Sequence, residues 1–347
     1  MKILLIGEYS GVHNNLKAGL KKLGHEVLLI GESDGFKNFP VDKKITPDNS
    51  GIIAKIKNIL SFYVFGKNNK FQIIQIINPF VLPMHLFFSL AIFRLIAKNG
   101  KVIYYCCGTD PAFLAAENKF RYFPFDKEGA SDIPGYTSIH HFYYKLFMLF
   151  IDRLITSSYT YTMGYQSHPK FLKIIPLPAF PEELERKLSK NDKIRILYGV
   201  TRPGMKGNKY IMEALNYIIE HKSDVFEVVI VDKIPFQKFG ALLHEFDIYI
   251  DQCKSYDYGM AAIVAMQKGL IVMSGANELA INSVFGSGCP VFHIEPSAEQ
   301  IIDKLNYLSG LNADEMLQIK KQGVAWVNTN HEQSVIAKKF VSQYELK

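Results

Sequence analysis

A glycine-rich loop that carries two cations is the segment of this sequence best suited to chemistry on a charged substrate. Residues 199–208 read GVTRPGMKGN and place Arg202 and Lys206 directly after a short apolar run. An arginine guanidinium, with its paired N–H donors, and a lysine ammonium can together neutralise a pyrophosphate leaving group as a glycosidic bond breaks. This needs no metal ion. We therefore predict that both cations are catalytic; a solvated basic turn is the alternative. The other ligand contacts expected from this loop are Gly199, Thr201 and Gly207.

A second loop, DQCKSYDYGM at 251–260, follows another apolar run and leads into a helical segment. Gly259 lies at the start of that helix and has no side chain, so a ligand can approach the helix N-terminus. The unpaired N–H groups and the helix dipole there favour a phosphate. We therefore expect two anion-favouring loops to converge in the C-terminal half, although a plain strand–helix connection is the alternative. We predict that this loop binds the substrate that carries the pyrophosphate, which we call the donor. The residues predicted to bind it are Tyr256, Asp257, Tyr258, Gly259 and Met260.

The N-terminal half has its own glycine turn. Residues 7–13, GEYSGVH, lie between the first apolar run and a helical segment that extends to about residue 23. Gly11 and the helix start would favour an anion or a sugar hydroxyl, and His13 lies beside them; a capping or surface role is the alternative for His13. The G-x-G-x-x-G spacing of dinucleotide sites is absent, which argues against a dehydrogenase.

Short apolar runs separated by helix-length segments predict an α/β protein with parallel sheets. The first series is 2–6, 26–30, 72–77, 102–105 and 153–156, and the second is 194–199, 226–231, 247–250, 270–273 and 290–294. A proline-rich and then charged segment at 176–192 suits an interdomain linker. We predict domains at 1–180 and 181–325, with a final helix at 326–347 that packs back on the first domain.

Composition limits the classes of function. The 347 residues suggest about two domains, and 48% hydrophobic with 21% charged residues is a globular composition. The opening residues lack a signal peptide, and the four cysteines show no metal or disulfide spacing, so we expect a cytoplasmic protein. The net charge of +7 fits phosphates or anionic lipids. No basic cluster or RNA-binding aromatic pattern supports nucleic-acid binding.

The apolar run from Pro79 to Phe93 is too short to span a membrane, for which about twenty residues are needed. A buried helix of the first domain is one interpretation. Peripheral contact with the inner face of the plasma membrane is the other, because basic and aromatic residues that alternate upstream are typical of faces that bind anionic lipid. Those upstream residues are Lys55, Ile56, Lys57, Ile59, Leu60, Phe62, Tyr63, Phe65 and Lys67.

The chain resembles the retaining GT-B glycosyltransferases of the large class known as family 4. The resemblance covers most of the chain and rests on the opening glycine turn, Arg202 with Lys206-Gly207, and Tyr258-Gly259 followed by Ala265-Met266 and Gly269. It implies two Rossmann-like parallel-sheet domains that face each other across a cleft. The cations would contact the donor diphosphate. The segment CGTD, where the family often has H-G-S-D, would line the acceptor side through Gly108, Thr109 and Asp110, together with Gly11 and His13.

Two family glutamates are replaced in this chain. They fall on Tyr256 and Val264, and either Asp257 or Glu278 could restore a carboxylate, with Glu278 the first choice because it follows a neighbouring strand. Where the family often has histidine, this chain has Cys107, a neutral thiol unsuited to the same acid–base work. Glu278 is therefore counted among the donor-binding residues.

The resulting hypothesis is a hexosyltransferase-like enzyme that needs neither cofactor nor metal, since no D-x-D pair lies beside the donor loops. It would move sugar from a nucleoside-diphosphate sugar to a hydroxyl of a glycan or lipid-linked polysaccharide precursor, with retention. A non-catalytic GT-B subunit is the alternative. A GT-B sugar-nucleotide epimerase would need acidic and histidine groups that the sequence does not place.

Overall fold

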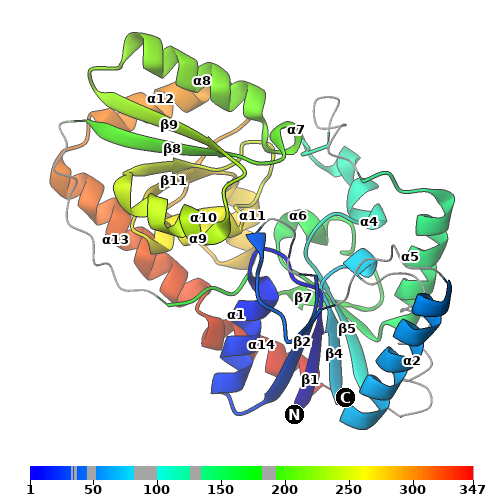
Figure 1. The fold of residues 1–347 in the computed structure, drawn as a ribbon. Coiled ribbons are helices and arrows are strands. Elements are labelled where there is room, and N and C mark those ends of the chain that lie inside the picture. Colours follow the sequence, from blue (N-terminus) through cyan, green and yellow to red (C-terminus); the bar gives the residue numbers. More distant parts are fainter. Residues whose placement is uncertain are drawn as a thin grey trace.

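The computed structural model describes residues 1–32, 34, 37–44, 52–81, 100–125, 134–181 and 193–346. They form two α/β units, each built on one parallel sheet (Figure 1). The predicted fold class is therefore confirmed. The ten predicted strands all exist, while the short edge strands β3 (Lys43–Lys44) and β7 (Phe171–Ile174) were not predicted.

The N-terminal domain has a seven-stranded sheet in the order β3-β2-β1-β4-β5-β6-β7. Alternate residues of its strands point to opposite faces, so one run of apolar residues supplies two cores. Its remaining strands are β1 (Lys2–Ile6), β2 (Glu26–Gly31), β4 (Ile73–Ile76), β5 (Lys101–Cys106) and β6 (Arg153–Thr156). Its helices are α1 (Val12–Lys22), α2 (Ile52–Asn69), α4 (Pro111–Leu114), α5 (Ser138–Phe150) and α6 (Tyr159–Thr162).

The two faces of this sheet are covered by different helices. Leu4 and Ile6 of β1 pack with α2 and α5, whereas Ile3 and Leu5 pack with α1 and with α14, the last helix of the chain. The chain therefore returns to the N-terminal domain at its end.

The C-terminal domain has a five-stranded sheet in the order β12-β11-β10-β8-β9. Helices α8 and α12 cover one face and α9, α10 and α13 the other (Figure 1). The strands are β8 (Ile194–Val200), β9 (Phe226–Asp232), β10 (Ile248–Ile250), β11 (Ile271–Ser274) and β12 (Phe292–His293). The helices are α7 (Pro203–Lys206), α8 (Asn208–His221), α9 (Phe236–Leu242), α10 (Met260–Gln267), α11 (Glu278–Val284), α12 (Ala298–Ser309) and α13 (Ala313–Asn330), with α14 at Gln333–Tyr344.

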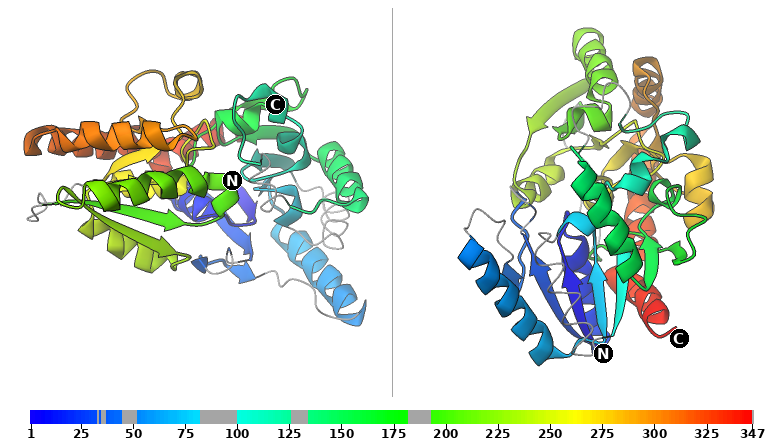
Figure 2. Two further views of the ribbon diagram at one scale, coloured as in Figure 1. Left: turned by 90° about the horizontal axis from the view of Figure 1, so that it is seen from above. Right: turned by 90° about the vertical axis from the view of Figure 1, so that its right-hand side faces the viewer.

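The chain passes between the domains twice, and the two crossing segments are hydrogen-bonded to each other. The Ala179 N–H donates to the carbonyl of His331 over 2.6 Å, and the Gln333 N–H donates to the carbonyl of Ala179 over 2.8 Å. The two domains lie beside each other in all three views (Figures 1 and 2). Residues 182–192 of the linker proposed at 176–192 lie outside the described residues, as do residues 82–93 of the apolar run.

No helix among the described residues is long and apolar enough to cross a membrane.

Candidate functional site between the two sheets

Three loops converge at the C-terminal edge of the five-stranded sheet. They follow the neighbouring strands β8, β10 and β11, and ligands of open parallel sheets bind at this edge. The Cys253 N–H donates to the Lys206 carbonyl over 3.0 Å, and the Asn277 N–H donates to the Tyr256 carbonyl over 3.0 Å. The two predicted anion loops therefore lie against each other, and a third loop joins them.

Gly207 is required where the first two loops meet. Its φ is +80°, and a Cβ there would lie 2.3 Å from Cys253 Sγ. Gly199 is buried near the end of β8, while the Thr201 side chain is half-buried just beyond it.

Arg202 is the exposed cation of this site. It precedes α7 in the left-handed region with φ +51°, a conformation that is uncommon for a residue with a side chain. Burial raises the pKa of Cys107 and of Tyr9, both in the N-terminal domain, and the Arg202 guanidinium counters a small part of that rise. Arg202 therefore lies within electrostatic range of residues of the other domain.

Lys206 is buried and paired. Its Nζ lies 2.6 Å from Asp251 Oδ1, and Asp251 itself is fully buried. Sequence analysis placed both residues in the correct loops but did not predict the pair. An ammonium has three donors, so this contact occupies only part of its hydrogen-bonding capacity.

Tyr256 contacts the N-terminal domain. Its hydroxyl accepts the Arg121 N–H over 3.0 Å, and its ring packs against Phe120 and Tyr122 with centroid distances of 5.3 and 4.8 Å. At the position where the resemblance implied a glutamate near the donor sugar, the structure therefore has an aromatic interdomain contact.

Asp257 is also used between the domains. Its carboxylate accepts the Thr160 N–H over 2.7 Å and the Thr160 hydroxyl at close range. Burial raises the pKa of Asp257 despite these hydrogen bonds. In this arrangement the carboxylate is turned to the N-terminal domain, which differs from the expectation that it restores a donor-binding carboxylate.

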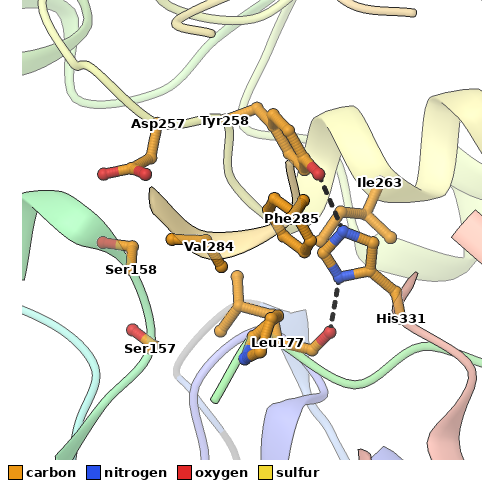
Figure 3. Close-up of a pocket in the computed structure, with 10 residues that line it drawn as sticks. Ser157, Ser158, Leu177, Asp257, Tyr258, Ile263, Val284, Phe285 and His331 are labelled. Carbon is orange, nitrogen blue, oxygen red and sulfur yellow. Dashed lines mark hydrogen bonds between the residues drawn. The ribbon is translucent and has the colours of Figure 1, made fainter. Parts of the chain in front are cut away.

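Tyr258 lies in a buried network beside the crossing segments (Figure 3). Its hydroxyl is 2.8 Å from His331 Nε2 and accepts the Trp326 Nε1–H over 2.8 Å, while His331 Nδ1 is 2.8 Å from the Leu177 carbonyl. Burial lowers the pKa of His331 to about 4, so the ring is neutral at physiological pH. The Tyr258 hydroxyl therefore points to His331 beside the crossing segments, and a donor contact of Tyr258 stays a prediction.

A small pocket adjoins this network (Figure 3). It has a mixed apolar and polar lining, and it lies where segments of both domains meet. The lining residues are Ser157, Ser158, Pro176, Leu177, Asp257, Tyr258, Ile263, Val284, Phe285 and His331.

The remaining donor-side residues have distinct surroundings. Gly259 precedes α10, and Met260 packs against cores of both domains. Glu278 is exposed in the first turn of α11, so its carboxylate is open to a ligand. Val264, at the second family glutamate position, is buried in the C-terminal core.

His13 and Asp110 are fully buried and hydrogen-bonded within the N-terminal domain, so their acceptor-side role stays a prediction. His13 Nδ1 lies 2.7 Å from the Gly7 carbonyl and Nε2 lies 3.1 Å from Gln75 Nε2, so both ring nitrogens have partners. Burial lowers the pKa of His13 to about 4. Asp110 accepts the hydroxyls of Tyr104 and Tyr165, each over 2.5 Å, and the N–H of Phe113 at the start of α4.

Gly11, Gly108 and Thr109 remain acceptor-side candidates at the C-terminal edge of the first sheet. Gly11 has φ +83° before α1, and Gly108 has φ +110° beside the Tyr9 ring. The Thr109 carbonyl accepts from Asn78 Nδ2 over 3.0 Å and from the Tyr136 hydroxyl over 2.8 Å. Burial raises the pKa of Cys107 to about 12, so this thiol is neutral.

Sequence analysis missed Glu8, a buried carboxyl at the end of β1. Its Oε2 accepts the N–H of Asn14 over 2.9 Å and the side-chain amide of Asn14 over 2.6 Å, while Oε1 has no hydrogen-bond partner. Burial raises the pKa of Glu8 to about 7, and Asp34 adds to the rise. The strand order changes direction between β1 and β4, the point where parallel sheets bind ligands. The sequence signal available was only that Glu8 stands in the glycine turn after the first apolar run.

The overall architecture is shared with several solved structures. No protein-family model and no curated protein sequence matches the chain. Among solved structures, a glycosyltransferase from Rickettsia africae is 14% identical with a TM-score of 0.60, over 99% of this chain and 97% of that one. Sucrose-phosphate synthase from Thermosynechococcus elongatus is 13% identical with a TM-score of 0.63, over 99% and 98%.

Anabaena HepE in complex with UDP and glucose is 11% identical with a TM-score of 0.61, over 99% of this chain and 98% of that one. A Listeria monocytogenes protein described as a UDP-N-acetylglucosamine 2-epimerase is 11% identical with a TM-score of 0.58, over 98% and 94%. At these identities the likeness establishes the fold: two parallel-sheet domains in the GT-B arrangement.

Proposed function

We propose that this protein is a glycosyltransferase that binds a nucleoside-diphosphate sugar on its C-terminal domain. The acceptor would be a hydroxyl of a glycan or lipid-linked polysaccharide precursor on the N-terminal domain. The class rests on likeness of the fold to solved glycosyltransferases. UDP is the first nucleotide to test because HepE was solved with UDP and with UDP-glucose.

The observation that carries this proposal is the position of Arg202. It is an exposed cation at the convergence of three loops, and Met205 of the same loop packs against the Phe113 cluster of the N-terminal domain. A fixed positive charge between the two sheets stabilises a diphosphate leaving group where the acceptor must also lie. Lys206 would add a second contact while it remains paired with Asp251.

The proposed reaction proceeds with retention and without a metal ion. The bond from the anomeric carbon to the β-phosphate oxygen breaks, and the acceptor oxygen bonds to the same carbon on the same face. The acceptor hydroxyl proton passes to the leaving phosphate, so no protein nucleophile is needed. Arg202 and Lys206 stabilise the charge that develops on the diphosphate.

Glu278 is the proposed partner of a sugar or ribose hydroxyl pair. An ionised carboxylate is the strongest acceptor for such a pair. The Glu278 side chain is exposed on α11, whose preceding turn hydrogen-bonds to the Tyr256 carbonyl through Asn277. Asp257 is not proposed for this role because Thr160 occupies its carboxylate.

The test is calorimetric titration of UDP, GDP and ADP, followed by turnover assays with the matching sugar nucleotides. Arg202→Ala should weaken nucleotide binding by about tenfold to a hundredfold, since a charge-assisted contact is worth about 1.5–3 kcal/mol. Lys238→Ala, which removes an exposed cation on α9, is the matched control and should bind normally.

Three outcomes would redirect the assignment. Nucleotide binding without turnover of any sugar nucleotide would indicate the non-catalytic subunit. A sugar nucleotide converted to its epimer would indicate an epimerase. If no nucleotide binds, or if Arg202→Ala binds nucleotide as tightly as the wild type does, the assignment of the donor site is contradicted.

A further inference from the structure

Two helices on the outer side of the N-terminal domain expose an unusual number of large apolar side chains. On α2 these are Ile56, Leu60 and Val64, exposed by 51%, 57% and 50%. They recur every four residues, so they form one line along the helix. On α5, Ile139, Phe142 and Leu149 are exposed by 62%, 61% and 77%.

The two exposed lines lie on the same side of the molecule. The inner faces of both helices pack on one core of the sheet, through Phe62 of α2 and through Tyr143 and Phe147 of α5. In Figure 1 and in the left view of Figure 2, α2 and α5 lie on the right-hand side of the N-terminal domain, away from the C-terminal domain. We call the six exposed residues and their basic neighbours the α2–α5 surface.

The charges on α2 and α5 have one sign. Neither helix contains Asp or Glu, and the exposed cations are Lys57 and Lys67 on α2 and Lys145 on α5. Lys43 adds a further cation, 4.7 Å from the centre of the Phe65 ring. Basic residues beside exposed apolar side chains favour an anionic lipid interface, where the apolar groups enter the acyl boundary and the cations meet headgroups.

We propose that the α2–α5 surface binds the face of an anionic membrane. Leu60, Phe142 and Leu149 would insert to the depth of the acyl boundary, and the lysines would pair with lipid phosphates. A second copy of this chain is a weaker fit, because a symmetric contact would bring lysines from both copies together without acidic partners. Membrane binding is inferred from the exposed apolar and basic residues of α2 and α5 alone. The further consequence, that the acceptor is lipid-linked, rests on the proposed function.

The experiment is sedimentation of the full chain with vesicles of phosphatidylcholine alone and of phosphatidylcholine mixed with phosphatidylglycerol. We expect binding to the anionic vesicles and little to the neutral ones. The double variant Leu60→Glu with Leu149→Glu should lose at least about tenfold in affinity, because it removes two inserted side chains and adds repulsion. Both positions are more than half exposed, so the fold should tolerate the change.

The matched control is Ile219→Glu with Tyr307→Glu, which alters apolar residues of the C-terminal domain that are 45% and 59% exposed. It should bind vesicles like the wild type. Equal binding of all three proteins, or no binding to anionic vesicles, would overturn the proposal. A wild-type dimer that becomes monomeric in the Leu60–Leu149 variant, without vesicle binding, would overturn it in favour of self-association.

Titration of the same proteins with UDP, GDP and ADP separates this proposal from the proposed function. Vesicle binding without binding of any of the three nucleotides would uphold the α2–α5 surface and contradict the proposed donor site. Nucleotide binding without vesicle binding would overturn the α2–α5 surface and uphold the donor site.

Discussion

Glu8 should make the stability of the N-terminal domain depend on pH in an unusual direction. Its carboxyl is 3% exposed, and burial raises its pKa from 4.5 to about 7. Because the pKa is higher in the folded protein, the unfolded chain releases this proton first as pH rises. The contribution of Glu8 to stability is therefore fully present below about pH 4.5 and is lost progressively up to about pH 7.

The size of the effect follows from the same two values. One pKa unit corresponds to about 1.4 kcal/mol, so Glu8 costs the native state about 3 kcal/mol above pH 7. Glu8→Gln removes the ionisation and keeps an oxygen that can accept from Asn14, as Oε2 does now. The variant should match the wild type below about pH 4.5 and exceed it by up to about 3 kcal/mol above pH 7.

Differential scanning calorimetry over this pH range measures the difference. For a domain of this size, about 3 kcal/mol raises Tm by roughly 6–12 °C. Glu213→Gln, on an exposed position of α8, is the control and should show a difference that does not change with pH. Two results would refute the argument that the ionised Glu8 carboxylate destabilises the folded protein. One is a Tm of Glu8→Gln that runs parallel to that of the wild type as pH changes. The other is a variant that is less stable than the wild type above pH 7.

Three further predictions concern the interface and the donor loops. Transfer should survive excess EDTA, and a strict Mg²⁺ or Mn²⁺ requirement would contradict the proposed phosphate site. Lys206→Ala should destabilise the protein by about 3–5 kcal/mol in thermal unfolding, because it leaves the buried Asp251 unpaired; an unchanged Tm would show that water reaches this carboxylate. Tyr258→Phe should cost about 1–3 kcal/mol by the same assay, since His331 Nε2 and Trp326 Nε1 both lose a partner. A neutral effect there would mean that water replaces the hydroxyl.

The sheets could be predicted from sequence because their apolar runs are continuous and separated by helix-length segments. Strands β3 and β7 were missed because each lies at a sheet edge, where burial is incomplete and the apolar signal is weak. The cationic loop was located, since a glycine-rich strand–helix turn is a local pattern. The partner of Lys206 was not, because Asp251 is 45 positions away and is brought close only by the pairing of β8 with β10.

Asp110 is a second residue whose contacts could not be predicted from the sequence. A motif comparison marks it as a ligand residue, yet its carboxylate is buried with two tyrosines and the start of α4. Whether a carboxylate faces a cleft or a core depends on burial, and burial is set by residues distant in sequence. Glu8 was overlooked for the same reason, although its place in the glycine turn after the first apolar run was visible.

Three consecutive residues of the donor-side loop connect it to other parts of the protein. Tyr256 contacts Arg121, Asp257 contacts Thr160 and Tyr258 contacts His331. Movement of the domains apart must therefore break contacts directly beside Gly259, where α10 begins.

The cost of that separation is smaller than the number of contacts suggests. The pKa of Asp257 is raised by burial even though Thr160 donates to it, so its hydrogen bonds do not fully replace lost hydration. When the domains separate, the carboxylate regains water, which offsets part of the lost bonding. Opening of the domains therefore costs less at Asp257 than it would at a carboxylate whose hydrogen bonds fully replaced its hydration.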